Sequence, residues 1–388
     1  IKIMNPRDSY VSGHPILIPM IDLVTIGAGC GSIAYVDSAG GFHVGPRSAG
    51  ADPGPACYGR GGEEPTVTDA QVVLGRLDAD KLLGGDLLLD PELARRAIEI
   101  KIAKSLNLST IDAALGIIKV INSNMALAIR SNSVARGIDP REYSLMPFGG
   151  AGPLHGVALA ESVSAKNVIV PVAPGITAAM GLLQTDMQYE HARSLIASLS
   201  KVTSDTAERM NSVLKELISE CRQDLEQDGV PAARHNFQRI AECRYHGQGF
   251  ELRADIPAGE ITQDNISGIV ANFHAQHRLD YGYAFEDGEV ELITIRAIGL
   301  EYVTPLKVTS LEQAAGGTID DAFLYRQQTV FDDGQTLATP RYDREKLKFG
   351  HVVPGPALVI QHNSTILIPP GYIAQTGEFG NLTIERSN

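Results

Sequence analysis

Several common features are scarce or missing in this sequence, and each absence excludes a class of protein. Only four cysteines occur and none form a Cys-x-x-Cys pair, so neither a disulfide scaffold nor a structural zinc site is expected. No stretch approaches the roughly 18 uncharged apolar residues of a membrane helix. A net charge of −13 argues against nucleic acid, because phosphate neutralisation needs clustered Lys and Arg. We therefore expect a cytoplasmic protein with neither a nucleic-acid nor a membrane partner.

The start of the chain lacks an initiator methionine and a leader. It opens Ile1-Lys2-Ile3, so we expect a piece of a longer polypeptide. Its 388 residues, 44% hydrophobic and 20% charged, are typical of a globular protein with two or three domains. Composition changes near residues 186–193, and we therefore predict one domain over 1–188 and another over 189–388.

Periodicity and capping signals predict the main elements. A helix should begin at Asp90-Pro91, because Asp is a typical N-cap and Pro a typical first helical residue. A longer helix should run from Thr110 to near Gly137, because Gly commonly ends a helix. Residues 143–172 fit a strand, a glycine turn, a helix and a strand, which implies a parallel pair with a crossover. Beyond these, helices over 210–229 and 262–279 and a mostly antiparallel sheet from 237–246, 249–255, 290–303 and 356–368 are predicted.

The first candidate site is a glycine-rich turn between two predicted strands. Asp22 ends the first strand, which is predicted over 15–22. The turn holds the following candidate phosphate ligands: Thr25, Gly27, Gly29, Cys30, Gly31 and Ser32. Closely spaced glycines let backbone N–H groups point into one small space, which suits phosphate oxygens. Asp22 could hold magnesium or polarise a water there. The alternative is a glycine-rich hairpin with a structural Asp. The spacing is not that of a dinucleotide-binding Rossmann motif.

The second candidate site is the turn before the helix of the β-α-β segment. It holds Gly149, Gly150 and Gly152, with His155 in the first helical turn. Glycines here permit a flat ligand to approach the backbone, and a helix N-terminus favours negative charge. A plain strand-to-helix turn and a structural histidine are the alternatives. Together the two turns suit a nucleotide, with phosphates at one turn and purine or ribose at the other.

Longer motifs carry a resemblance to a known family. Residues 19–34 (PMIDLVTIGAGCGSIA), 44–62 (VGPRSAGADPGPACYGRGG), 65–70 (PTVTDA) and 148–155 (FGGAGPLH) closely resemble the hydantoinase A/oxoprolinase family. The resemblance continues in shorter motifs at 74–77, 139–141, 174–175, 181–183, 244–248, 281–283 and 355–357. It therefore spans nearly the whole chain.

This resemblance implies an α/β fold of the actin-like, sugar-kinase and heat-shock ATPase type, present in part, followed by a mixed α+β C-terminal domain. It implies ATP and Mg²⁺, with Asp22 and the first turn as the second phosphate motif and the second turn as the adenosine motif. The family's first phosphate motif, Asp-x-Gly-Gly-Thr, is missing from these residues. We therefore expect that lobe to come from a separate chain or a lost segment, and the chain not to hydrolyse ATP alone. A hydantoinase B-type subunit is the implied partner.

Cysteine, aspartate and histidine side chains outside the glycine positions are further candidates for a site. Cys30 stands where the family usually has Gly, and a positive φ there would cost on the order of 1 kcal/mol; its thiol could also be reactive. Asp69 is a further candidate acid, although Thr68-Asp69 could equally cap the following helix. His274 and His277 share a helix face, but two histidines without a third ligand do not indicate zinc.

Three functions follow as hypotheses. The first is part of an ATP-dependent amidohydrolase for a lactam or hydantoin ring, whose carbonyl is activated by phosphorylation. The second is a subunit of an ATP-dependent, biotin-independent ketone carboxylase. The third is a non-catalytic binding or scaffold subunit, suggested by the missing phosphate motif and Cys30. The sequence does not separate the two enzymes or name the small-molecule substrate.

Overall fold

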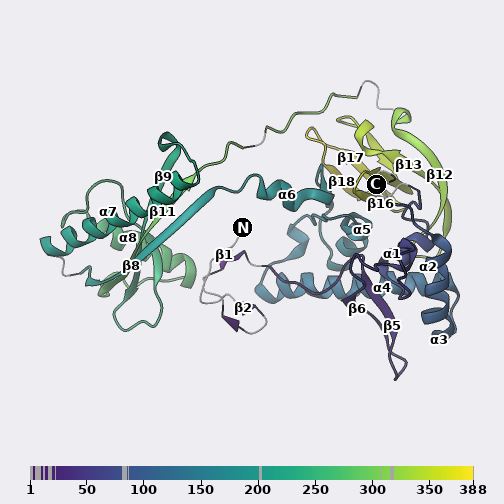
Figure 1. The fold of residues 1–388 in the computed structure, drawn as a ribbon, viewed down its shortest axis with the longest axis horizontal. Helices are drawn as coiled ribbons and strands as arrows, with labels where there is room; N and C mark the ends of the chain where they lie inside the picture. Colours follow the sequence, from purple (N-terminus) through teal and green to yellow (C-terminus); the bar gives the residue numbers. More distant parts are fainter. Residues whose placement is uncertain are drawn as a thin grey trace. The chain divides into compact units, whose positions relative to one another are not determined.

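The structure is a computed structural model in which the chain divides into two compact units. One unit combines Ile1–Ala179 with Val308–Asn388, and the other is Met180–Lys307. We refer to them as unit 1 and unit 2 and describe each by itself (Figure 1). The residues that the structure describes are 3–4, 10–11, 14–15, 20–21, 23–80, 85, 87–200, 203–305, 307–314 and 319–387.

Four helices of unit 1 pack against one another. They are α1 (Val67–Val73), α2 (Pro91–Ile98), α4 (Thr110–Asn132) and α5 (Gly152–Val163). A π-helical turn (Glu99–Ala103) and α3 (Lys104–Leu106) continue α2. As predicted, Asp90 caps α2 with Pro at the first helical positions. The long helix begins at Thr110 as predicted. Its α-helical part ends at Asn132, and a 3₁₀ turn (Val134–Arg136) follows that ends at Gly137, where φ is +76°.

A β-hairpin lies beside these helices. β5 (Ser32–Val36) pairs antiparallel with β6 (Phe42–Ser48), and α4 contacts β6. Figure 1 shows the two strands projecting from the helical cluster. Four two-residue strands precede them: β1 (Ile3–Met4), β2 (Tyr10–Val11), β3 (His14–Pro15) and β4 (Met20–Ile21). Most of the strand predicted over 15–22, including Asp22, lies outside the described residues.

Two four-stranded sheets complete unit 1. One has the order β12-β13-β15-β16 and the other β14-β17-β18-β7, so that the end of the chain pairs with a strand from its middle. The strands are β7 (Val168–Val170), β12 (Phe323–Val330), β13 (Thr336–Asp343), β14 (Val352–Pro354), β15 (Ala357–Gln361), β16 (Ser364–Ile368), β17 (Tyr372–Thr376) and β18 (Leu382–Arg386). The short helix α6 (Thr177–Leu182) leads into unit 2.

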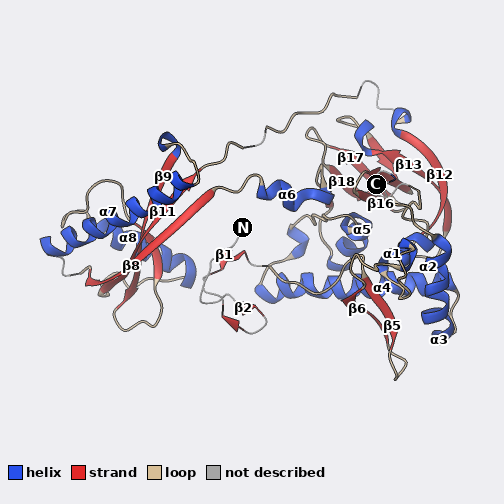
Figure 2. Ribbon diagram, in the orientation of Figure 1, coloured by secondary structure: helices blue, strands red, loops and turns tan. Residues whose placement is uncertain are grey.

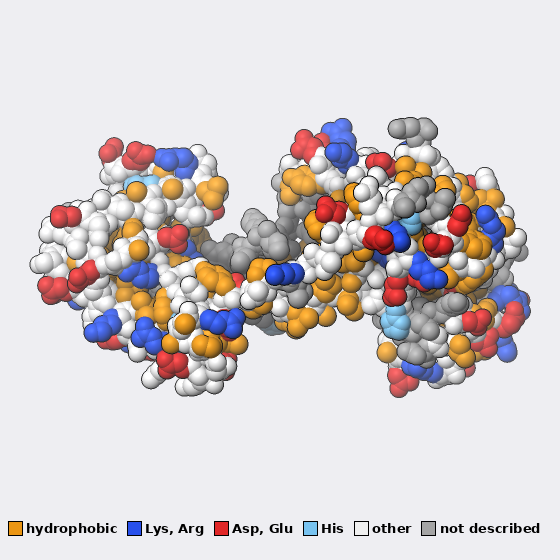
Figure 3. Space-filling view, turned by 90° about the horizontal axis from the view of Figure 1, so that it is seen from above, with side chains coloured by type: hydrophobic (Ala, Val, Ile, Leu, Met, Phe, Trp, Pro, Cys, Tyr) orange, Lys and Arg blue, Asp and Glu red, His pale blue; other side chains and the backbone are white. Residues whose placement is uncertain are grey.

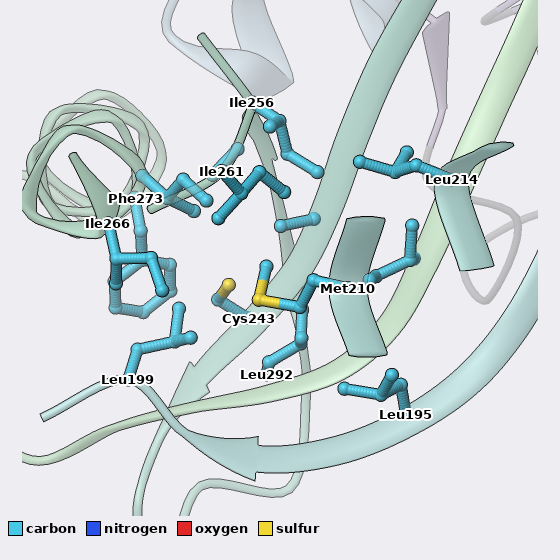
Figure 4. Packing of buried hydrophobic residues seen from close by; sticks show 14 of the residues in the cluster. Leu195, Leu199, Met210, Leu214, Cys243, Ile256, Ile261, Ile266, Phe273 and Leu292 are labelled. Carbon is cyan, nitrogen blue, oxygen red and sulfur yellow. The ribbon is translucent and has the colours of Figure 1, made fainter. Parts of the chain in front are cut away.

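Unit 2 is a two-layer arrangement of helices on one antiparallel sheet (Figure 2). The sheet order is β10-β9-β11-β8. Its strands are β8 (Met187–Ser198), β9 (His235–Tyr245), β10 (Leu252–Asp255) and β11 (Val290–Glu301), and its helices are α7 (Ser204–Gln227) and α8 (Ile266–Tyr281). Figure 4 shows Met210 of α7, Phe273 of α8 and Cys243 of β9 directed into one shared core. Apolar side chains that recur at helical spacing in α7 and α8 and at strand spacing in the sheet are buried between the layers, and this burial stabilises the packing.

Two expectations about topology need revision. Residues 356–368 were predicted to join the sheet of 237–303, but β15 and β16 belong to another sheet, where β15 pairs in parallel with β13. Alternating polarity identifies a strand but not its partner. The parallel pair predicted over 143–172 is present, although its first strand is reduced to a bridge between Leu145 and Val168. The domain boundary at residue 188 falls within β8 and stays a prediction.

Helix α4 is more apolar than the sequence analysis anticipated. By length and composition alone it could cross a membrane. In the structure its buried side chains, including Ile117, Ile118 and Ile121, pack into a core of unit 1. The core helix of a globular protein passes the same test, so this helix is weak support for a membrane span.

On the face of the molecule in Figure 3, basic and acidic side chains are interspersed.

Candidate nucleotide site

The first glycine turn is an exposed loop that leads into β5 and is fixed by Ser32. The Ser32 hydroxyl donates to the carbonyl oxygen of Gly27 at 3.1 Å and accepts from the Gly29 N–H at 2.9 Å. Gly27 has φ +61°, and a Cβ there would lie 2.8 Å from Cβ of Pro46. Only glycine suits that position. Thr25 lies exposed at the start of the loop.

The carbonyl groups of Cys30 and Gly31 accept hydrogen bonds from the described part of the protein, whereas the N–H groups of the same two residues do not donate to it. Cys30 O accepts from both the N–H and the hydroxyl of Thr68 at 2.9 Å, and Gly31 O accepts from the N–H of Ala49 at 2.8 Å. The N–H groups of Cys30 and Gly31 donate to no residue that the structure describes. Unpaired N–H groups on a tight turn attract anions. The geometry therefore fits the phosphate oxygens of a nucleotide.

Cys30 causes no backbone strain in this turn. It is not among the described residues with positive φ, so the backbone strain of about 1 kcal/mol that a positive φ would cause does not arise. The residue is exposed, yet the surrounding loop desolvates its sulfur and raises the pKa of the thiol. A raised pKa leaves less thiolate and lowers reactivity.

The second glycine turn lies between the bridge at Leu145 and helix α5. Gly149 has φ +85° and donates from its N–H to Pro174 O at 2.7 Å. A Cβ on Gly150 would meet the backbone oxygen of Asn363 at 3.3 Å, and Gly152 begins α5. No side chain caps α5. Pro153 has no N–H, and the Leu154 N–H donates to Ala151 O at 3.0 Å. The Gly152 N–H donates to no described residue and can receive a ligand.

His155 is buried within the helical core and does not face either turn. Its Nδ1 atom lies 2.6 Å from Oδ1 of Asn122 on α4, and its Nε2 atom lies 3.3 Å from Nε2 of Gln71 on α1. Burial lowers the pKa of the ring to about 4. The structural alternative for His155 is the one that this geometry supports, and the residue ties α5 to the two other helices.

Asp69 is likewise occupied by structural contacts. Its fully buried carboxylate accepts from the N–H groups of Ala56, Cys57 and Thr66 and from the Thr66 hydroxyl, at 2.7 to 3.3 Å. Together with Thr66 it forms a capping box at the start of α1. Capping is thus the role that the structure shows for Asp69.

No described contact joins the two glycine turns. The first turn contacts residues 45–50 and α1, and the second contacts Pro174 and the loop at Asn363. Within the described ranges no cluster of three His, Cys, Asp or Glu side chains could hold a metal ion. In unit 2, His274 bonds to the Tyr245 hydroxyl and His277 to Tyr283 O and Gln248, so both serve the local packing of α8.

A polar pair on the hairpin that follows the first turn was not predicted from the sequence. At the tip of the β5–β6 hairpin, Nε2 of His43 lies 2.7 Å from Oδ2 of Asp37. The His43 ring stacks on Tyr35, with centroids 5.1 Å apart. Hydrogen bonds hold the pKa of Asp37 below its ordinary value. The bond from the Gly41 N–H has the larger effect, and the bond with the His43 ring adds to it. An Asp and a His flanking Gly40-Gly41 would have been the signal.

Comparison with solved structures defines the class of fold. The chain superposes on a nucleotide-free acetone carboxylase structure, titled for ATP-dependent acetone carboxylation, with a TM-score of 0.89 and 24% identity, covering 100% of this chain and 55% of the other. It also matches the crystal structure of an ATP-dependent caprolactamase from Pseudomonas jessenii with a TM-score of 0.71 and 33% identity, over 96% of this chain and 54% of the other. The predicted α/β fold class is confirmed.

The chain belongs to the hydantoinase/oxoprolinase family. The family profile matches residues 2–191, and the profile of the family's C-terminal domain matches residues 197–383. The caprolactamase alpha subunit of Pseudomonas jessenii is 35% identical over 94% of this chain and 53% of its own length. The acetophenone carboxylase gamma subunit of Aromatoleum aromaticum is 34% identical over 91% and 49%. The chain thus spans about half the length of these relatives.

Proposed function

We propose that this chain is part of an ATP-dependent cyclic-amide hydrolase that activates its substrate by phosphorylating the amide carbonyl oxygen. The observation that carries the proposal is the first glycine turn, whose Cys30 and Gly31 N–H groups are available to phosphate oxygens. Its support from relatives is the similarity to a caprolactamase subunit over 94% of the chain.

An amide carbonyl is a poor electrophile, which explains the need for ATP. Phosphorylation of the oxygen makes the carbon more reactive toward water and supplies a leaving group. In the proposal, the first turn holds the phosphates and Gly149, Gly150 and Gly152 line the adenosine. Asp22, which lies outside the described residues, would hold Mg²⁺ near the γ-phosphate. Each of these assignments is a prediction for the complete protein.

The proposal requires further polypeptide. The first phosphate motif is not in these residues, so we propose that another segment or chain supplies it. The relatives named as alpha and gamma subunits favour a multi-subunit assembly, in which we propose a hydantoinase B-type partner. A cytoplasmic location also stays a prediction.

A ketone carboxylase is the second candidate. The similarity to an acetophenone carboxylase subunit is nearly as high, at 34% identity. In that reaction an enol oxygen, rather than an amide oxygen, would receive the phosphoryl group, and the same turn would hold the nucleotide. A non-catalytic subunit is the third candidate.

ADP release by the complete assembly tests the three candidates. The assembly is purified from its native source through a tag on this chain and given Mg·ATP with 2-pyrrolidinone, 5-oxoproline or hydantoin, or with acetone or acetophenone plus bicarbonate. ADP formation that depends on a cyclic amide is the expected result. Dependence on a ketone and bicarbonate favours the carboxylase. An assembly that neither binds nor hydrolyses ATP is a binding or scaffold complex.

A further inference from the structure

A cavity of about 400 Å³ opens beside the first glycine turn. The turn contributes Ile26 and Gly27, the β5–β6 hairpin contributes Phe42 and His43, and α4 contributes Val120. Apolar side chains and polar groups contribute about equally to the surface of this cavity. A pocket of this size and character suits a small organic molecule. Its place next to the phosphate turn would bring that molecule close to a bound γ-phosphate.

His43 lines this cavity with a half-exposed side chain, and one of its ring nitrogens has no partner among the described residues. The carboxylate of Asp37 can only accept, so the Nε2 atom of a neutral His43 ring carries the hydrogen and donates it to Oδ2 at 2.7 Å. The Nδ1 atom is then left as an acceptor, and it has no partner among the described residues. Asp37 is itself fixed, because its Oδ1 atom accepts from the N–H groups of Ala39 and Gly41 at 2.9 and 2.8 Å.

We propose that this cavity is the substrate subsite, and that Nδ1 of His43 accepts the ring N–H of a cyclic amide. The inference rests on the proposed function and deepens it by naming a residue that would determine specificity. The apolar wall of Ile26, Phe42 and Val120 covers the methylene groups of the ring, while the carbonyl oxygen faces the glycine turn.

This arrangement distinguishes a cyclic amide from a ketone. A lactam or hydantoin carries an N–H donor next to its carbonyl, whereas a ketone has none. A site that bonds a polar group favours a ligand that offers it over an analogue that lacks it. Because the His43 side chain is 46% exposed, water can replace the missing donor and the expected preference is about tenfold rather than absolute. The orientation of His43 by Asp37 therefore favours a hydrolase substrate over a carboxylase substrate.

Substrate analogues and His43 variants test the polar contact. In the complete assembly, with the cyclic amide that gives the fastest ADP release, the unmodified protein should prefer the free N–H compound over its N-methyl derivative. We expect H43F to raise KM for the free amide about tenfold and to abolish this preference, leaving KM for ATP unchanged. H43Q should restore much of the low KM for the free amide and of the preference over the N-methyl derivative, since the glutamine amide can donate to Asp37 and still accept the ring N–H. Equal KM values for all three proteins would overturn the assignment of His43.

A pair of matched substitutions tests the cavity. V120F fills this cavity, whereas V134F makes the same change in a separate cavity of about 490 Å³ lined by Arg130, Gly137 and Ser162. We expect V120F alone to raise KM for the cyclic amide while KM for ATP stays constant. Amide-dependent turnover that V120F leaves unaltered would overturn the subsite but keep the proposed function. If no cyclic amide supports turnover, both the subsite and the proposed function are overturned.

Discussion

The carboxylate of Asp69 accepts a hydrogen bond from the backbone N–H of Cys57 at 2.7 Å. This contact fastens the turn at residues 56–58 to the first turn of α1 and completes a buried set of four donors around one carboxylate. A buried anion with all its partners supplied organises a loop rather than a reaction.

Asp69→Asn should therefore destabilise unit 1 and leave catalysis intact. The asparagine amide places N–H hydrogens where donors already point, and we expect a loss of about 3 kcal/mol in the free energy of unfolding. Urea unfolding measures this loss, and the kcat of the folded assembly should not change. Asp112→Asn is the matched control, since Asp112 occupies the corresponding first-turn position of α4 but is exposed. A stable Asp69→Asn variant with abolished kcat would restore Asp69 as a catalytic acid.

Gly27 and Gly29 should respond differently to alanine. Gly27→Ala forces φ +61° on a residue with a Cβ and drives that atom to 2.8 Å from Pro46, so a destabilisation of about 1–3 kcal/mol and a lower Tm are expected. Gly29 has open space around it and no positive φ. Gly29→Ala should fold normally but weaken ATP binding about tenfold, because its methyl group hinders close approach of phosphate. Normal ATP affinity in Gly29→Ala would argue against a phosphate site at this turn.

Asp22→Asn tests the proposed magnesium ligand. The substitution keeps the size of the side chain and removes its charge, so phosphoryl transfer in the complete assembly should fall about 100-fold or more, with Tm nearly unchanged. ADP release and differential scanning calorimetry provide the two measurements. Normal turnover together with a Tm several degrees lower would make Asp22 a structural residue.

His155 should make stability fall on acidification. Its pKa is lowered by burial to about 4 from 6.5, so the unfolded chain binds the proton more readily. The associated stability is fully present above pH 6.5 and is lost as pH falls toward 4, by up to about 3 kcal/mol.

Urea midpoints at pH 7 and pH 4.5 measure this dependence. His155→Gln keeps hydrogen-bonding groups near Asn122 and Gln71 without a titratable ring, so the midpoint of this variant should change less between the two pH values. An identical pH dependence in both proteins would mean that the pKa of His155 is the same in the folded and unfolded states.

The sequence alone determined features that depend on near neighbours in the chain. Asp90-Pro91 predicted the start of α2, Thr110 the start of α4, and the apolar spacing over 210–229 and 262–279 predicted α7 and α8. Caps and periodicity act within a turn or two, so they can be read without the fold. The motifs at 19–34 and 44–62 also predicted the family, because long motifs are specific.

Only the tertiary structure decided which distant groups meet. It buried His155 between Asn122 and Gln71, surrounded Asp69 with donors from residues 56–66, and paired β15 with β13 rather than with the sheet of unit 2. It also placed His43 at a cavity shared with α4. These outcomes depend on which surfaces pack together across long stretches of chain, and a local pattern specifies that a residue is polar or apolar without specifying its partner.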